Sequence, residues 1–228
     1  MLDDLRARVC AVNQMLSSAG LAPQTWGNAS GIDRAAGLVA IKPSGVPYAA
    51  LTPDDIVLVD LDGRPAFGSL APSVDLPTHL ELYRAFPELG GVVHTHSHYA
   101  VCWAQARRPI PCLGTTHADY FHGDVPLTRQ LTEAEMDDYE ANTGRIIAET
   151  FGRRPALECP GVLVAGHAPF TWGASVEKAL EAALVLEEIA RMAFDTRCIL
   201  PDSPALENHL IAKHHERKHG ARAYYGQR

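Results

Sequence analysis

Apolar residues recur along this chain with two alternating periods, and the alternation predicts helices interleaved with strands. Residues 3–21 place leucine, valine and methionine at helical spacing and reach Gly20, which is typical of an amphipathic helix and its stop signal. The short runs 38–41, 56–61 and 161–165 are rich in branched apolar residues and lie between turn residues, which predicts buried strands.

Later stretches return to helical spacing, and several carry capping residues. The Thr132-x-x-Glu135 sequence is a capping box, and Asp62-Gly63 after the second strand is a hairpin signal. The helices predicted in this part of the chain are 77–86, 99–106, 132–151, 175–194 and 203–220. Because the chain shows no internal repeat and no linker, the pattern predicts a single α/β domain over residues 1–228.

The central element of this pattern is a strand that carries two histidines. Two glycines indicate a tight turn into Val92 and Val93, and His94 and His96 follow. Side chains on a strand alternate between faces, so these two imidazoles point the same way and can converge on one divalent ion. The alternative is a pair of hydrogen-bonded core histidines.

Two further residues are candidate ligands for the same ion. His167 follows the strand predicted at 161–165, as the first pair follows its own strand, and is the natural third imidazole. Asp75 directly precedes the helix predicted at 77–86. It is therefore either an ordinary helix cap or a carboxylate ligand.

Two polar loops have the groups that hold an anion. In the segment 25–31, Gly27 lets the backbone approach a ligand and Asn28 offers an amide donor. The Lys42-Pro43-Ser44-Gly45 segment combines a cation, a hydroxyl and a glycine, which suits a phosphate. Taken singly, either loop also fits a plain surface turn.

Two other segments mix residue types in an unusual way. Residues 114–121, which include Asp119, are dense in polar groups flanked by apolar ones, and we expect a cleft there. Tyr224 and Tyr225 lie close to the end of the chain, where an aromatic pair predicts docking on this chain or on a neighbouring subunit.

Composition excludes some classes of function. The net charge of −7 argues against nucleic-acid binding and requires local groups to hold an anionic substrate. The five cysteines form no C-x-x-C pair, so free thiols in a reducing compartment are expected. The acidic first residues and the absence of a long apolar run predict no signal peptide and no membrane segment, and hence a cytoplasmic protein.

Together these motifs resemble the class II aldolase/adducin/epimerase family over the whole chain. The motifs that carry the resemblance are Thr25-Trp26-Gly27-Asn28, Lys42-Pro43-Ser44-Gly45, Asp75-x-Pro77-Thr78-His79, His94-Thr95-His96-Ser97, Gly114-Thr115-Thr116-His117-Ala118-Asp119-Tyr120 and Lys218-His219-Gly220-Ala221-x-Ala223-Tyr224-Tyr225-Gly226-Gln227. The segment around Asp119 and the Tyr-Tyr-Gly-Gln ending resemble the epimerase branch. The resemblance implies a three-layer α/β/α sandwich with a central, largely antiparallel or mixed sheet. It also implies a homotetramer in which the tail, 221–228, reaches the active site of a neighbouring subunit.

The resemblance also implies roles for individual residues. The implied metal ligands are Asp75, His94, His96 and His167. The implied substrate and phosphate pocket comprises Gly27, Asn28, Lys42, Ser44, Gly45, Ser73 and the backbone of Val74. The implied acid/base groups are Asp119 and, from a neighbouring chain, Tyr225, with His214 close to them. Zinc suits imidazoles with one carboxylate, and manganese or cobalt are alternatives.

The implied activity is metal-dependent 4-epimerisation of L-ribulose 5-phosphate to D-xylulose 5-phosphate in L-arabinose catabolism, by cleaving and re-forming the C3–C4 bond. The alternatives are a class II aldolase, an epimerase of a related sugar phosphate, and a non-catalytic adducin-like scaffold. One position departs from the pattern, because Val74 stands where a second serine is usual. The missing hydroxyl predicts weaker phosphate binding or a somewhat different substrate, since a hydrogen bond to a charged group contributes about 1.5–3 kcal/mol.

Overall fold

A computed structural model describes residues 2–220 and 223–225. Within them, seven strands form one sheet in the order β4-β3-β2-β1-β5-β7-β6. The strands are β1 (Asn28–Asp33), β2 (Leu38–Ile41), β3 (Val57–Asp60), β4 (Pro65–Phe67), β5 (Gly91–His94), β6 (Gly161–Leu163) and β7 (Pro169–Gly173). All neighbouring strands pair antiparallel, so the sheet is antiparallel throughout and not mixed.

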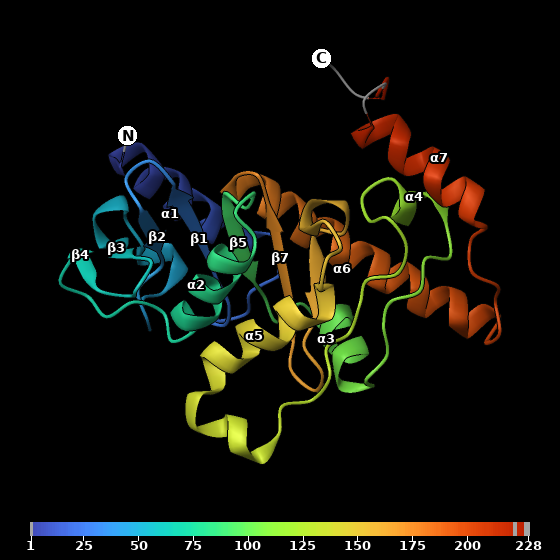
Figure 1. Ribbon diagram of the computed structural model, residues 1–228, viewed down its shortest axis with the longest axis horizontal. Coiled ribbons are helices and arrows are strands. Elements are labelled where there is room, and N and C mark those ends of the chain that lie inside the picture. Colours follow the sequence, from blue (N-terminus) through green and yellow to red (C-terminus); the bar gives the residue numbers. More distant parts are fainter. Residues whose placement is uncertain (1, 221–222, 226–228) are drawn as a thin grey trace.

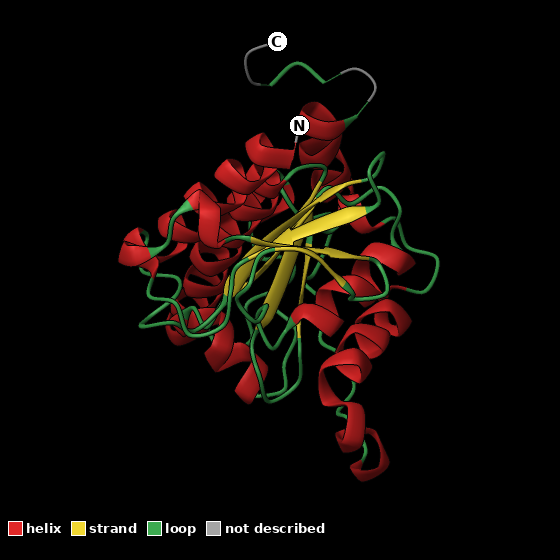
Figure 2. Cartoon of the chain, turned by 90° about the vertical axis from the view of Figure 1, so that its left-hand side faces the viewer, coloured by secondary structure: helices red, strands yellow, loops and turns green. Residues whose placement is uncertain are grey.

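Helices cover both faces of this sheet (Figures 1 and 2). They are α1 (Leu2–Ser18), α2 (Leu76–Ala85), α3 (His98–Gln105), α4 (Thr115–Ala118), α5 (Tyr139–Phe151), α6 (Val176–Ile199) and α7 (Asn208–His219). Short 3₁₀ helices lie at Tyr48–Ala50, Pro53–Asp55, Glu133–Asp138 and Ala156–Glu158. No helix in the part of the chain that the structure describes is long and apolar enough to cross a bilayer.

Strand alternation divides the core into two layers. On β5, Val93 packs with residues of α1 and the first half of α6, whereas Val92 faces the opposite layer with α2 and α5. Both valines are fully buried. The predicted three-layer α/β/α sandwich is therefore confirmed.

The predicted elements are found with shifted ends. The strand 38–41 is confirmed, and the runs 56–61 and 161–165 shorten to β3 and β6. The capping box at Thr132 and Glu135 is present, but it opens a 3₁₀ helix, and α5 begins at Tyr139. The last helix begins at Asn208 rather than at Ser203. Residues 204–207 form no helix, and the backbone N–H of Leu206 instead donates a hydrogen bond to the Cys112 carbonyl.

One stretch expected to be a loop is a central strand. Most of the segment 25–31 forms β1, which pairs with β2 on one side and β5 on the other. The sequence pattern did not predict this strand because its residues are small or polar and not branched and apolar. The buried Ser30 hydroxyl, for example, lies 2.7 Å from His79 Nδ1 and 2.8 Å from the Tyr83 hydroxyl. Strand β7 was likewise not predicted.

The two glycines before the histidine strand also serve a different purpose from a turn. Gly91 belongs to β5 and pairs with Gly31 on β1 and Gly173 on β7, which makes a row of glycines across three strands. An added Cβ at Gly91 would overlap the backbone of Val176, where α6 begins. The glycine row therefore lets α6 cross the sheet at close range.

Candidate functional site

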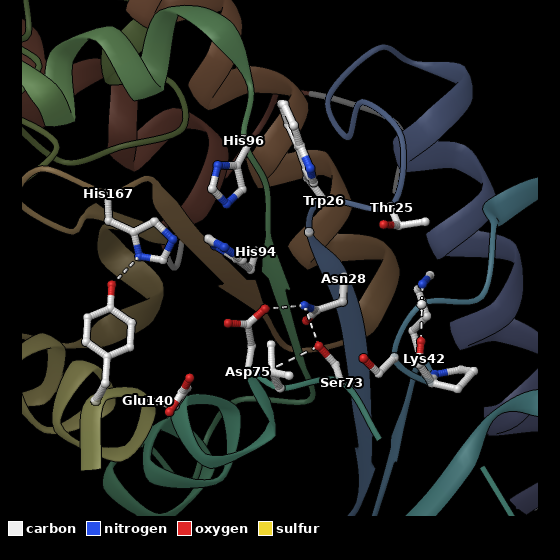
Figure 3. Close-up of a pocket in the computed structure, with 16 residues that line it drawn as sticks. Thr25, Trp26, Asn28, Lys42, Ser73, Asp75, His94, His96, Glu140 and His167 are labelled. Atoms are coloured by element: carbon white, nitrogen blue, oxygen red, sulfur yellow. Dashed lines mark hydrogen bonds between the residues drawn. The ribbon is translucent and has the colours of Figure 1, made fainter. Parts of the chain in front are cut away.

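Three imidazoles meet where β5 ends (Figure 3). His94 is the last residue of β5, His96 lies two residues on, and His167 lies in the turn between β6 and β7. The antiparallel pairing of β5 with β7 sets His94 opposite Phe170 and so brings the turn alongside. One ring nitrogen from each histidine lies within 4.8 Å of the others, which satisfies the geometry of a shared metal ion.

Neighbouring groups orient two of these rings. The Nδ1–H of His94 donates to the Pro169 carbonyl at 3.0 Å, and its ring stacks on Phe170 with centroids 4.2 Å apart. Nδ1 of His167 lies 3.1 Å from the Tyr139 hydroxyl. Because each Nδ1 is engaged, Nε2 of His94 and of His167 is left for a ligand, which is the usual arrangement around a protein-bound metal.

Burial favours the neutral form of two of the three rings, His96 and His167. Burial, assisted by the neighbouring His94, lowers the pKa of His96 and of His167 to about 4. A neutral imidazole has a lone pair to offer a cation, so the residues present fit a divalent ion.

Asp75 lies beside these histidines, and its side chain caps no helix. It occupies the position before α2 without a side-chain capping bond, and instead accepts a hydrogen bond of 2.6 Å from Asn28 Nδ2. Burial acts to raise the pKa of Asp75, but His94, His79 and the Asn28 bond outweigh it and lower the pKa. Its carboxylate faces the pocket (Figure 3) yet lies outside the compact group of three imidazoles, so its ligand role stays a prediction.

A cavity of ≈ 620 Å³ opens from the imidazoles toward the two polar loops. Its lining includes every residue predicted for the metal and for the substrate: Gly27, Asn28, Lys42, Ser44, Gly45, Ser73, Val74, Asp75, His94, His96 and His167. It also includes Tyr139 and Glu140, which the sequence analysis missed because they follow a capping box and read as an ordinary helix start. The structure thus assembles eleven predicted residues around one cavity.

Lys42 is the strongest sign of an anion in this cavity. Its side chain is 2% exposed, and its ammonium contacts only the Pro43 carbonyl at 3.2 Å and the face of Tyr48 at 4.9 Å. No carboxylate among the described residues pairs with it, and burial lowers its pKa. A buried cation that lacks a protein anion is stabilised when a ligand supplies one.

Asn28 and Gly27 differ in what they offer to a ligand. Both amide hydrogens of Asn28 are used, on Asp75 and on Ser73 Oγ at 3.0 Å, whereas its Oδ1 is buried without a partner. Asn28 therefore presents an acceptor, not the donor that the sequence suggested. Gly27 has φ +86°, and a Cβ there would lie 2.5 Å from the His94 carbonyl oxygen, so only glycine fits.

The predicted acid/base residues gather elsewhere in the chain. Asp119 follows α4, and Arg217 of α7 donates to its carboxylate through Nε at 2.8 Å and Nη2 at 2.6 Å. Nδ1 of His214 lies 3.1 Å from the same carboxylate, and the Arg217 guanidinium lies over the Tyr225 ring at 4.8 Å. We call Asp119, His214, Arg217 and Tyr225 the Asp119 cluster.

The Asp119 cluster does not line the imidazole cavity of its own chain. Figure 1 places α4 and α7 together, away from β1 and α2. The sequence analysis predicted that a neighbouring chain supplies Tyr225, and it made no such prediction for Asp119. Because Arg217 contacts both Asp119 and Tyr225 in one chain, we expect a chain that supplies the tyrosine to supply the aspartate too. Residues 221–222 and 226–228 of the predicted tail contact lie outside the described residues.

A three-layer sandwich whose antiparallel sheet carries three imidazoles beside a cavity lined by polar loops is typical of a protein of the class II aldolase type. The chain belongs to this family, since the Class II Aldolase and Adducin N-terminal domain matches residues 7–194.

Particular relatives narrow the comparison. The chain is 51% identical over 228 residues, which is 100% of both chains, to proteins named L-ribulose-5-phosphate 4-epimerase UlaF from Salmonella paratyphi A and Salmonella typhi. Among solved structures, an L-fuculose 1-phosphate aldolase superposes with a TM-score of 0.81 at 23% identity, covering 94% of this chain and 95% of that one. The aldolase/epimerase/decarboxylase-like YgbL from Escherichia coli has a TM-score of 0.74 at 26% identity and covers 94% and 99%.

Proposed function

We propose that the chain is an L-ribulose-5-phosphate 4-epimerase, which interconverts L-ribulose 5-phosphate and D-xylulose 5-phosphate. The observation that carries the proposal is the end-to-end 51% identity with proteins of that name, in a chain that keeps the three imidazoles together. The Asp119 cluster adds the two proton-transfer groups that cleavage and inversion at C4 require.

The reaction cannot run by simple removal of the C4 proton. That hydrogen is two carbons from the ketone and is not acidic, so the C3–C4 bond must break and re-form on the opposite face. The three imidazoles would hold a divalent cation, and such an ion would supply Lewis-acid stabilisation of the negative charge that this cleavage leaves on the ketone fragment. Zinc suits these ligands, and manganese or cobalt would also fit.

The cavity residues hold the substrate while its fragments rearrange. Lys42, Ser44 and Ser73 all line the cavity, and their ammonium and hydroxyl groups bind the 5-phosphate. The unpartnered Oδ1 of Asn28 accepts a hydrogen bond from a sugar hydroxyl. With both ends of the pentulose held, the aldehyde fragment turns without escaping.

Inversion at C4 requires proton transfer to the C4 oxygen on two sides. Asp119 and Tyr225 supply the two groups, and His214 hydrogen-bonds Asp119. Since these residues lie outside the cavity of their own chain, they act on the cavity of a neighbouring subunit. We place this shared site in a homotetramer, working in L-arabinose catabolism. The five unpaired cysteines suit the reducing cytoplasm.

Substrate conversion by single variants tests the proposal. Purified protein supplied with L-ribulose 5-phosphate should form D-xylulose 5-phosphate, detected with a coupled assay. Asp119→Asn and Tyr225→Phe should each slow turnover roughly tenfold or more, because each removes a proton-transfer group. The controls are Tyr224→Phe, which changes the adjacent exposed tyrosine, and Asp137→Asn on an exposed 3₁₀ turn.

The same assay separates the alternatives. Release of dihydroxyacetone phosphate from a deoxyketose 1-phosphate would indicate an aldolase, and turnover of a different pentulose phosphate would indicate a related epimerase. Purified protein without bound metal and without turnover would indicate an adducin-like scaffold. Near-normal rates in both Asp119→Asn and Tyr225→Phe would remove the epimerase assignment.

A further inference from the structure

Arg217 contacts both of the groups that the proposed function uses for proton transfer. Its guanidinium grips the Asp119 carboxylate through two parallel hydrogen bonds, of 2.8 and 2.6 Å. The same guanidinium lies over the ring of Tyr225, 4.8 Å from the ring centroid. A bidentate fork fixes a carboxylate in one plane, which a single hydrogen bond to His214 cannot do.

The backbone of Arg217 also holds the tyrosine. Its carbonyl accepts hydrogen bonds from the backbone N–H of Tyr224 at 2.9 Å and of Tyr225 at 3.1 Å. The backbone of Tyr225 is thus tied to the backbone of Arg217, so we expect a displacement of Arg217 to displace Tyr225 as well. Both tyrosines are more than half exposed, so little packing competes with these contacts in setting their direction.

The helix that bears Arg217 is held by polar and ring contacts and not by a buried apolar face. None of the residues of α7 is buried, although the helix runs from Asn208 to His219. His214 and Arg217 lie three residues apart and so project from one face, toward Asp119. A further contact comes from His219, whose Nε2 lies 2.8 Å from the Asp119 carbonyl. The contacts to Asp119 act together with two others on the same helix, the stacking of His215 on His122 and of the Lys218 ammonium on the Tyr120 ring.

We infer that Arg217 is a positioning residue that fixes Asp119 and Tyr225 as a single acid/base unit for delivery to the neighbouring cavity. This inference rests on the proposed function. It assigns to Arg217 a role that acts through two other side chains, without contact to the substrate.

The charge of Arg217 gives this role a measurable signature. Burial acts to raise the pKa of Asp119, but the bonds from Arg217 and His214 outweigh it and hold the pKa below its ordinary value. The charged and titratable groups near the carboxylate are Arg217, His214 and His219 on α7, His117 on α4, and Tyr225 and Lys218 beyond the guanidinium. Without the guanidinium the pKa of Asp119 would rise. As the pH is lowered, the carboxylate would then take up a proton sooner, and turnover that needs the anion would be lost at a higher pH than in the wild type.

The test compares Arg217→Met and Arg217→Lys with Arg64→Met. Arg64 forms an exposed ion pair with Asp62 in the β3–β4 hairpin and serves as a matched control. Arg217→Met should lower kcat by roughly tenfold or more with little change in KM, and should move the acidic limb of the kcat–pH profile upward by about one unit. Arg217→Lys restores a charge but not the fork, so it should restore the limb while kcat stays low.

A direct readout accompanies the kinetics. In protein labelled with 3-fluorotyrosine, the ¹⁹F resonance of Tyr225, assigned with Tyr225→Phe, should shift in Arg217→Met and stay in place in Arg64→Met. An Arg217→Met enzyme with the wild-type pH profile, kcat within twofold of wild type and an unmoved resonance would overturn the inference. If Arg217→Met does not fold, Arg217→Lys decides, and full kcat in that variant would overturn it. If Asp119→Asn and Tyr225→Phe are themselves fully active, the proposed function fails, a result distinct from a failure of Arg217 alone.

Discussion

At the scale of single residues, the cavity is lined by side chains whose partners already use most of their polar atoms. Both amide hydrogens of Asn28 are bonded, and Nδ1 of His94 and of His167 each has a partner. These contacts leave only certain polar atoms of the three side chains free for a ligand. The free atoms are Nε2 of His94 and His167 and Oδ1 of Asn28. Ligand chemistry at this site is therefore set by what the surrounding residues leave unused.

Tyr139 provides a test of this view. Its hydroxyl lies 3.1 Å from Nδ1 of His167, so Tyr139→Phe should leave that imidazole without its orienting partner. We expect the affinity for zinc to fall by roughly tenfold or more. Competition with a chromophoric chelator measures this in the metal-free protein, independently of turnover.

Tyr224→Phe is the control for that measurement, since Tyr224 is exposed and lies on the tail. Equal zinc affinity in Tyr139→Phe and wild type would show that the hydroxyl does not orient the ligand. A change in thermal stability of the metal-free protein would instead point to packing around α5.

The residues of the cavity were predictable where a motif announced them. His94 and His96 followed from strand alternation, and the Lys42 loop from its combination of charge, hydroxyl and glycine. Tyr139 and Glu140 were not predictable as cavity residues, because they belong to α5, an element distant in sequence from the motifs. The junction of Arg217 with Asp119, 98 residues apart, was equally out of reach of local patterns.

At the scale of elements, the glycine row decides how closely α6 crosses the sheet. Gly91 in the centre faces the backbone of Val176, and Gly173 faces Lys178 of the same helix. Gly31 at the other end faces Leu5 and Val9 of α1. The row crosses β5 at Gly91, the first residue of that strand, whereas His94 is its last residue.

Gly91→Ala should therefore be strongly destabilising. The added methyl group meets backbone, which cannot rotate away, and overpacking of this kind costs about 3 kcal/mol. Urea unfolding of the two proteins measures the difference in the free energy of unfolding.

The matched control is Gly114→Ala. Nothing lies within 4 Å of a Cβ at that position, and its φ of −155° is open to any residue. We expect a change in the free energy of unfolding below about 0.5 kcal/mol. Equal stability of Gly91→Ala and Gly114→Ala would contradict the close approach of α6.

Element prediction failed where tertiary partners replaced the usual local signal. Strand β1 lacks a run of branched apolar residues, because Ser30 hydrogen-bonds within the core and Gly31 makes room for α1. Strand β7 begins at Pro169 and reads as a loop until its pairing with β5 is known. Helices with regular apolar spacing were found: α2 lies within one residue of its predicted ends, and α6 begins one residue later and ends five residues later than predicted.

At the scale of the whole molecule, the fold class was predictable because the family motifs span the chain, and the matched family region confirms it. The way in which two chains share a site was not predictable, because no local sequence pattern indicates that the imidazole cavity and the Asp119 cluster lie apart in one chain. That separation allows a direct test of shared sites.

Mixing two inactive variants should restore activity. In an oligomer of His94→Asn and Asp119→Asn chains, some sites combine an intact cavity from one chain with an intact Asp119 cluster from the next. Random mixing of equal amounts should give about a quarter of the wild-type rate. Co-expression with two different affinity tags, followed by tandem purification, supplies the mixed oligomers for the assay.

Each variant alone should stay inactive in the same assay, and a His94→Asn/Asp119→Asn double variant mixed with wild type serves as the control. Mixed oligomers with no more activity than the separate variants would show that each chain works on its own cavity.

The distance between the imidazole cavity and the Asp119 cluster has a consequence for the newly made enzyme. On the proposed function, a solitary polypeptide carries the full set of reactive groups but cannot bring them to bear on one sugar. Quaternary association then becomes the step that switches the chemistry on. A reactive aldehyde fragment is generated only where a second subunit already closes over it, and dilution below the association threshold should silence the protein without unfolding it.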